Sequence, residues 1–217
     1  MAGLASTGNA QVCMGTPSFS TGSVRIGGSA LISSDSKAYG AQAAIGTWKN
    51  WSISGAFAHA KIDSTDGSSN MGGAAVSYQY DMSGSTVQLC PTVGVYAQEG
   101  SLVGEVPFPN NPQNTLDVHV GGSLGWVASS SSSMEVIPAI SAAWVARSHK
   151  NKIVQLGVNN PTTTDNFGLF TGTIGFVFNK RCTISPIVTV PVSEENGKAS
   201  FGVGVSYNFN PPGWLHM

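Results

Sequence analysis

The chain has 217 residues, a formal net charge of −1 and only 10% charged residues, well below the quarter usual in soluble domains. The near-neutral charge and the lack of a Lys/Arg cluster exclude the electrostatic signature of a nucleic-acid-binding protein. Mean hydropathy is +0.06, and no apolar run approaches the roughly 18 residues that a spanning helix needs. Few charges and 27 glycines favour a transmembrane β-barrel, whose apolar residues occupy alternate positions; a secreted soluble β-sandwich is the alternative.

The first segment, residues 1–19, is expected to be an irregular periplasmic lead-in. It lacks the basic region and the apolar core of a complete signal peptide. Gly8-Asn9-Ala10 before Gln11 has the small residues of a cleavage-site tail. We therefore place the start of the barrel near residue 20.

Residues 20–209 contain ten runs in which apolar and small polar residues alternate, close to the 9–11 residues that a tilted membrane strand requires. The runs lie near 22–32, 38–46, 50–60, 71–80, 86–98, 115–127, 133–147, 167–178, 182–192 and 198–209. We predict an all-β fold, a single antiparallel up-and-down transmembrane β-barrel of about ten strands. An even number of strands returns both ends of the barrel to one side. Residues 210–217 form a tail that this barrel does not need.

The connections between the runs alternate between two classes. One class is short and covers 47–50, 81–85, 128–132 and 179–181. The other is mostly longer and more polar and covers 33–37, 61–70, 99–114, 148–166 and 193–197. Short periplasmic turns and longer outer loops are typical of outer-membrane barrels. A soluble sandwich has no reason to sort its loops by end.

Large apolar residues are expected on the outer face, as the last run illustrates. From Phe201 to Phe209, every second residue is large and apolar, whereas the residues between are Gly, Ser and Asn. Descending runs end in aromatic residues at the short-turn side, which predicts an aromatic girdle at one membrane interface. The girdle comprises Trp48, Trp51, Tyr78, Tyr80, Trp126, Phe176, Phe178, Tyr207 and Phe209.

Three ascending runs carry a proline at the same position: Pro91, Pro138 and Pro186. Proline cannot donate a hydrogen bond to a strand ladder, so it argues against a fully paired strand. We therefore predict a ring of bulges or kinks at this level, where Gly28 and Gly55 occupy the equivalent position. The alternative is that these strands begin only after the proline.

The lumen face is expected to be mostly small, with few ionisable residues: Arg25, Asp117, His119, Glu135 and Arg147. A hairpin centred near 130–132 brings Asp117 and Arg147 opposite each other toward the outer mouth. Arg25 and Glu135 both begin ascending strands and are expected to meet across the inner end. Since buried charges need partners, these pairs predict salt bridges that hold the lumen closed or a charged constriction in a narrow channel.

The candidate for catalysis is His119 with Asp117 and a lumen serine such as Ser141. A hydrolase needs a nucleophile within reach of a histidine that an acid orients. No nucleophile motif accompanies these residues, so we predict no enzyme and no catalytic residues. The polar run at 63–70 lacks the ligand spacing of a calcium loop, so we predict no metal site, and we expect no cofactor.

The three cysteines, Cys13, Cys90 and Cys182, all map to the inner end of the barrel. The periplasm is oxidising, so one disulfide is expected. Cys90 points inward by parity and Cys182 starts its strand near the rim. We favour a Cys13–Cys90 bond, with Cys13–Cys182 as the alternative.

The closing strand Val205-Ser206-Tyr207-Asn208-Phe209, the prolines of the ascending strands and the loop asymmetry resemble the small outer-membrane β-barrel proteins of Gram-negative bacteria. The resemblance covers about residues 20–209 and is one of pattern. It implies a bacterial outer-membrane location, contact with outer-membrane lipid and insertion by the barrel-assembly machinery. In that family the final aromatic residue usually ends the chain, whereas here residues 210–217 follow it.

The function expected from these features is that of an integral outer-membrane barrel with a structural or narrow passive pore role. The alternative is surface adhesion through loops 99–114 and 148–166, because the first of these combines apolar residues with three prolines. An outer-membrane hydrolase and a soluble sandwich remain further alternatives. No nucleic-acid partner is expected.

Overall fold

The computed structural model describes residues 16, 22–34, 36–47, 50–62, 68–81, 87–100, 113–153, 158–159, 163–193 and 198–209. These residues form β1 (Val24–Ile32), β2 (Ser36–Gly46), β3 (Trp51–Ile62), β4 (Ser68–Tyr78), β5 (Tyr80–Asp81), β6 (Val87–Gly100), β7 (Gln113–Trp126), β8 (Ser129–Ser130), β9 (Met134–Ile153), β10 (Val158–Asn159), β11 (Thr163–Phe178), β12 (Cys182–Val192) and β13 (Ser200–Phe209). No helix among the described residues is long and apolar enough to cross a membrane.

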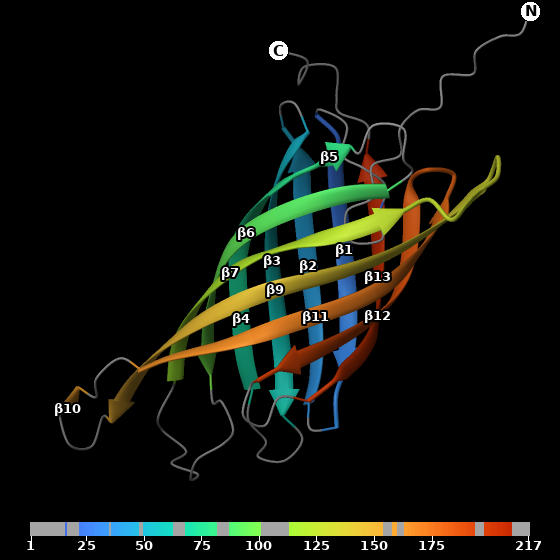
Figure 1. Ribbon diagram of the computed structural model, residues 1–217. Helices are drawn as coiled ribbons and strands as arrows, with labels where there is room; N and C mark the ends of the chain where they lie inside the picture. The colour runs from blue at the N-terminus through green and yellow to red at the C-terminus, as the bar shows by residue number, and fades with distance from the viewer. Residues whose placement is uncertain are drawn as a thin grey trace, which may run out of the picture.

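Ten long strands close into an antiparallel barrel, which confirms the predicted fold class (Figure 1). Each strand pairs with its neighbour in the chain, from β1 through β2, β3, β4, β6, β7, β9, β11, β12 and β13. The last pairing, between β13 and β1, runs from Val24↔Phe209 to Ile32↔Phe201 and leaves no free edge. The short strands β5, β8 and β10 extend this wall at its two ends.

The connections sort to opposite ends of the barrel as predicted, and we name the two ends accordingly. The turn end carries the described turns 127–133 and 179–181, and strands β1, β3, β6, β9 and β12 all run toward the opposite end, the loop end (Figure 1). Asn179 and Lys180 both have positive φ, the conformation of the tight hairpin turns that match strand twist. The link at 33–35 is tighter than expected, because the Ser33 amide donates to the Ser36 carbonyl at 2.9 Å.

The expectation that 148–166 is a loop is only partly correct. β9 continues to Ile153, and β10 pairs back onto it through Val158 and Asn159. β11 begins at Thr163, so these strands extend beyond the runs predicted for them. The residues of this extra length are mostly polar, so no apolar alternation marks it in the sequence.

The three prolines lie inside their strands, each at the fifth residue, so the alternative that the strands begin after them is wrong. Pro91, Pro138 and Pro186 each keep a pairing partner on one side: Gly122, Ile174 and Val203. On the other side, the β4–β6, β7–β9 and β11–β12 ladders all lack a pair at the proline. After the gap at Pro138, pairing resumes at Ser129↔Val136 with one extra residue on the β7–β8 side, a β-bulge. The predicted ladder defects are therefore present at the three prolines, whereas Gly28 and Gly55 are paired on both sides and interrupt no ladder.

The barrel has the opposite polarity from a soluble protein. Its large apolar side chains lie on the outer face, where Phe201, Tyr39 and Trp144 are 61%, 58% and 57% exposed. Arg25, Asp117 and Glu135 are buried on the lumen face. A soluble sandwich would bury the apolar set instead. The polarity is that of a wall between an apolar exterior and a polar interior.

Candidate functional site in the barrel lumen

An ion pair lies on the lumen wall near the loop end. Asp117 on β7 and Arg147 on β9 are direct cross-strand partners. Arg147 donates from Nη2 to Asp117 Oδ2 at 2.9 Å and from Nε to Asp117 Oδ1 at 3.0 Å. Asp117 is only 2% exposed. A carboxylate this buried is held by a two-pronged guanidinium contact, which is the strongest form of such a pair.

Aromatic rings lie against Arg147 and His119 in this region. The Arg147 guanidinium lies 4.7 Å from the centre of the Phe167 ring on β11. Tyr96 on β6 contacts His119, with ring centres 4.7 Å apart. The Tyr96 ring lies over Gly73 of β4, its cross-strand partner, and a Cβ on that glycine would come within 2.3 Å of Tyr96 Cδ1. We call Tyr96, Asp117, His119, Arg147 and Phe167 the outer cluster.

The geometry of the outer cluster does not assemble a catalytic triad. His119 Nε2 is 3.9 Å from Asp117 Oδ2, beyond hydrogen-bond range, because the carboxylate is engaged by Arg147. The cross-strand neighbour of His119 is Val145, whereas the candidate nucleophile Ser141 pairs with Ser123. In the described part of the chain, His119 Nε2 is buried without a hydrogen-bond partner. The absence of enzymatic activity stays a prediction.

The predicted contact between Arg25 and Glu135 is wrong. Arg25 Nε donates to Oδ1 of Asn208, its cross-strand partner on β13, at 2.7 Å, and Nη1 donates to Thr16 Oγ1. Glu135 instead accepts a hydrogen bond from Ser130 Oγ at 3.4 Å. Among the described residues, the partners of Arg25 and Glu135 thus lie on different elements, and no bond joins the two across the lumen.

In the turn-end half of the barrel, buried side chains on the lumen face come from strands all around the wall. Those buried residues, which we call the basal layer, are Arg25, Ser52, Gln79, Gln88, Cys90, Ser123, Glu135, Ile137, Val177, Thr183, Ser185 and Ser206. Ile137 and Val177 are fully buried and form a small apolar core, packed against Val127. Thr16 is also buried and reaches this layer through its bond to Arg25. Of this layer, the sequence pattern places Arg25, Glu135, Cys90, Ser52 and Ser123 on the lumen face, and it does not mark the apolar contact of Ile137 with Val177.

Some polar atoms of the basal layer lack a partner. Both amide atoms of Gln79 are buried and unpaired within the described chain, as are the hydroxyl groups of Ser123 and Thr183. Gln79 lies between β4 and β5, beside the ladder gap at Pro91. The unpaired side-chain amide of Gln79 thus lies where the β4–β6 ladder is interrupted. The sequence pattern did not indicate this unpaired amide.

The predicted girdle residues that the structure describes lie on the outer face near the turn end. Trp51 contacts Tyr78, and Tyr207 contacts Phe209, with ring centres 5.0 and 4.7 Å apart. Trp126, Tyr80 and Phe178 are exposed there, and Phe176 is half-buried. Trp48 is outside the described residues.

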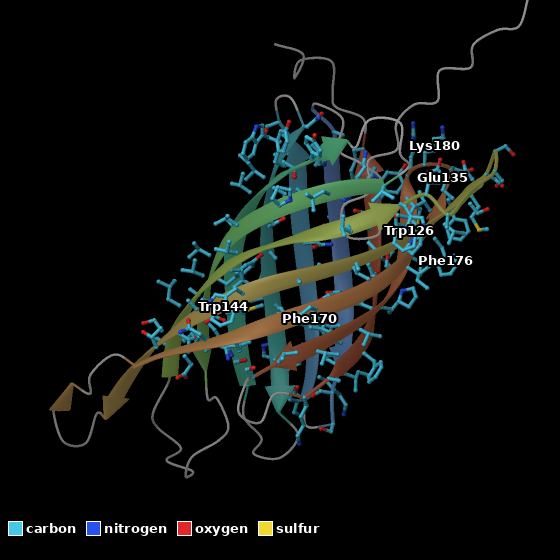
Figure 2. All side chains as sticks on the ribbon, viewed as in Figure 1. Trp126, Glu135, Trp144, Phe170, Phe176 and Lys180 are labelled. Carbon is cyan, nitrogen blue, oxygen red and sulfur yellow. The ribbon has the colours of Figure 1, made fainter. Side chains whose placement is uncertain are left out.

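A second set of exposed aromatic residues lies nearer the loop end: Tyr39, Phe57, Trp144, Phe170 and Phe201. Figure 2 places Trp126 and Phe176 toward one end of the barrel and Trp144 and Phe170 farther along it. Phe201 and Phe209 are eight residues apart on β13, roughly 27 Å along the strand at about 3.4 Å per residue. A tilt of about 40° reduces this to roughly 20 Å, near the height of the apolar band of a membrane barrel.

Cys182 is a free thiol, which argues against the Cys13–Cys182 alternative. Cys90 is fully buried on the lumen face. Cys13 lies outside the described residues, so the favoured Cys13–Cys90 bond stays a prediction. The predicted adhesive ranges 99–114 and 148–166 also fall partly outside them, and their described residues lie mainly in β6, β7, β9, β10 and β11. No metal-binding group of three His, Cys, Asp or Glu side chains occurs among the residues described.

No protein-family model matches the chain, and no curated protein matches it by sequence. Solved structures do match it in fold. The β domain of the Bordetella autotransporter BrkA superposes with a TM-score of 0.53 at 10% identity, covering 86% of this chain and 98% of that one. A bacterial polysaccharide outer membrane secretin superposes with a TM-score of 0.50 at 11% identity, covering 89% and 67%.

These comparisons, together with the closed ladder and the outward apolar face, define the class of fold. It is the fold of an outer-membrane β-barrel. At such low sequence identity the likeness concerns the fold alone.

Proposed function

We propose that this protein is an integral barrel of the Gram-negative outer membrane with a structural or narrow passive pore role. The observation that carries the proposal is the inverted polarity of the wall, in which Phe201, Tyr39 and Trp144 are exposed while Arg25 and Asp117 are buried. Exposed apolar surface on this scale is stable only against lipid or a partner. The closed ladder favours lipid, because it leaves no unpaired backbone edge in the apolar layer.

In this proposal, the turn end faces the periplasm and the loop end faces outward. The short turns at the end that holds Trp51, Tyr207 and Phe209 support this orientation. Insertion would depend on the barrel-assembly machinery. A test of location is extraction: the protein should require detergent and show heat-modifiable mobility on a gel. Solubility without detergent, together with unchanged mobility after boiling, would contradict the membrane assignment.

The lumen in this proposal has two closures in series, the outer cluster and the basal layer. Removing one alone should leave conductance low, because the other still limits the flow. We expect Arg147→Ala and Arg25→Ala to conduct little in planar bilayers and the double variant to conduct clearly more than the native protein. Absence of conductance in all three variants would rule out a pore and leave the structural role.

A disulfide between Cys13 and Cys90 belongs to the same proposal. Cys90 is fully buried on the lumen face, whereas Cys182 is a free thiol. Such a bond would tie the N-terminal segment to the basal layer. Non-reducing peptide mapping of the native protein should find Cys13 and Cys90 in one linked peptide and Cys182 unlinked. Three free thiols would contradict it.

A further inference from the structure

Five hydroxyl residues form one continuous row on the lumen face of the wall. Ser123 on β7 pairs with Ser141 on β9, and Ser141 pairs with Thr171 on β11. Thr171 pairs with Thr189 on β12, and Thr189 pairs with Ser200 on β13. Cross-strand partners share one face of a sheet, and neighbouring strands lie about 4.8 Å apart. Five successive strands of the barrel therefore each present a hydroxyl group, and we call these residues the hydroxyl row.

The hydroxyl row runs obliquely from the turn-end half of the lumen to the loop end. Ser123 lies near the turn-end terminus of β7, which is Trp126, whereas Ser200 is the first residue of β13 at the loop end. The row is oblique because the strands of a barrel tilt against its axis, as β9 and β11 do in Figure 1. One end of the row thus lies in the basal layer and the other at the outer mouth.

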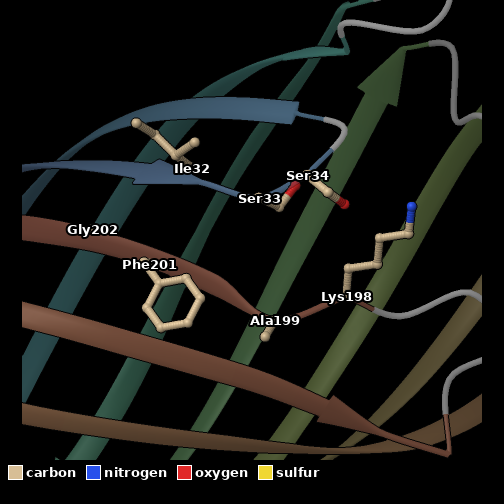
Figure 3. Close-up of a pocket in the computed structure, with 7 residues that line it drawn as sticks. All are labelled: Ile32, Ser33, Ser34, Lys198, Ala199, Phe201 and Gly202. Atoms are coloured by element: carbon tan, nitrogen blue, oxygen red, sulfur yellow. The ribbon is translucent and has the colours of Figure 1, made fainter.

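A hollow of about 730 Å³ lies at the loop-end terminus of the hydroxyl row (Figure 3). Both chain neighbours of Ser200, Ala199 and Phe201, line this hollow. Ser33 and Ser34 line it as well. The hollow therefore adds further hydroxyl residues at the point where a solute from outside would first meet the row.

The hydroxyl row has capacity for further hydrogen bonds. Ser141, Thr171, Thr189 and Ser200 are half-buried, so solvent reaches them. The Oγ1 atoms of Thr171 and Thr189 lie 3.2 Å apart and share one hydrogen bond. A hydroxyl group has one donor and two acceptor sites, so this pair can still bond to a solute.

The inner end of the row holds a buried hydroxyl group without a partner. Ser123 is 3% exposed, and its Oγ makes no hydrogen bond within the described chain. Buried polar groups are normally hydrogen-bonded, so such a group requires an explanation. A solute hydroxyl bound at Ser141, the cross-strand partner of Ser123, would lie next to this atom and supply the missing bond.

The hydroxyl row carries no charge. β12 and β13 contain no Asp, Glu, Lys, Arg or His. The charged residues Asp117 and Arg147 on β7 and β9 bond to each other. The donors and acceptors that line a lumen select its solutes. A wall of uncharged hydroxyl groups suits a neutral solute that itself carries several hydroxyl groups.

We propose that the hydroxyl row binds a small neutral sugar or polyol that enters from the loop end. The hydroxyl groups of the solute bond in turn to the hydroxyl groups of successive strands. The proposal rests on the proposed outer-membrane barrel, and it names the class of solute for its lumen. It requires binding but not passage through the basal layer, so a barrel that does not conduct ions is compatible with it.

The test uses the full-length protein refolded in micelles of a zwitterionic detergent that has no sugar headgroup. Saturation-transfer NMR titrations measure the affinity for sucrose and for gluconate, a hydroxyl-rich anion. We expect saturable binding of sucrose and about tenfold weaker binding of gluconate, because the row offers no cation to a desolvated carboxylate. Thr171→Val/Thr189→Val removes two hydroxyl groups but keeps the side-chain shape, and it should weaken sucrose binding about tenfold. Ser123→Ala should weaken it about threefold.

The matched control is Ser77→Ala/Thr92→Val. It removes another hydroxyl pair, 2.8 Å apart, from β4 and β6, outside the hydroxyl row. Sucrose affinity should not change. An equal loss in this control would overturn the proposal, and so would undiminished binding in Thr171→Val/Thr189→Val or Ser123→Ala.

Equal affinity for sucrose and gluconate would also overturn the proposal. Folding of each protein is scored separately by the gel shift on heating. A folded native protein that does not bind sucrose overturns this inference alone. A protein that is soluble without detergent and shows no gel shift overturns the proposed membrane location and this inference with it.

Discussion

The outer cluster and the basal layer are two halves of one lumen, yet they are held by different interactions. In the outer cluster, one carboxylate and one guanidinium form a direct cross-strand pair, Asp117 and Arg147. In the basal layer, Arg25 donates to the neutral side-chain oxygens of Asn208 and Thr16. That layer also contains an apolar contact between Ile137 and Val177.

In both halves an arginine on the lumen face bonds to a group on the strand paired with its own. Arg147 reaches Asp117 on β7 and Arg25 reaches Asn208 on β13, and Arg25 also donates to Thr16 in the N-terminal segment. Register therefore determines which groups pair. The two halves should respond differently when a side chain is shortened, because one depends on charge and the other on packing.

The largest effect is expected from Arg147→Ala in the outer cluster. The variant leaves the Asp117 carboxylate, 2% exposed, without its guanidinium partner. Removing one member of a buried pair typically costs about 3–5 kcal/mol, and we expect about 3 because Arg147 is 19% exposed. Urea unfolding in lipid vesicles, followed by tryptophan fluorescence, measures this loss. The double variant Asp117→Asn/Arg147→Ala should recover about half of it; no recovery would mean that the charge of Asp117 is not the cause.

The sequence predicts the barrel well because lipid and lumen impose a period of two on every strand. Phe201 to Phe209 alternate in exposure as expected, and the hairpin register that opposes Asp117 and Arg147 follows from counting outward from one turn. Beyond Arg147 the sequence of β9 is mostly polar and shows no apolar alternation, so the end of the strand is missed.

Counting residues outward from a turn also cannot predict contacts between residues whose strands are not neighbours in the barrel. Arg25 and Glu135 share a level in the sequence pattern, but the circular order of strands separates them by three strands. The Gln79 amide is orphaned by a ladder gap that only the paired backbone reveals. The register within one hairpin can therefore be predicted from the sequence. Contacts that form only when the whole barrel closes cannot.

A comparable but smaller effect is expected from Ile137→Ala in the basal layer. Ile137 is fully buried against Val177, so shortening it removes contacts and leaves a cavity. Such substitutions cost about 2–5 kcal/mol, and we expect about 2 because the contact is a small cluster. The unfolding measurement is the same. Ile140→Ala, three residues along β9 but 57% exposed on the outer face, is the control and should cost less. Equal losses would mean that the basal layer is not packed.

The smallest effect is expected from Gln79→Met in the basal layer, and it should have the opposite sign from the loss expected in the outer cluster. Gln79→Met replaces a fully buried amide, unpaired within the described chain, with an apolar side chain of similar length. Leaving a buried polar group unsatisfied costs about 1–3 kcal/mol, so its removal should raise the free energy of unfolding by about 1 kcal/mol. The same measurement decides between two states of the layer. A lower free energy would instead mean that ordered water bonds the Gln79 amide, since removing a satisfied group destabilises. Removing a polar group should lower the free energy of unfolding in the outer cluster. In the basal layer it should raise this free energy only if no water bonds the Gln79 amide.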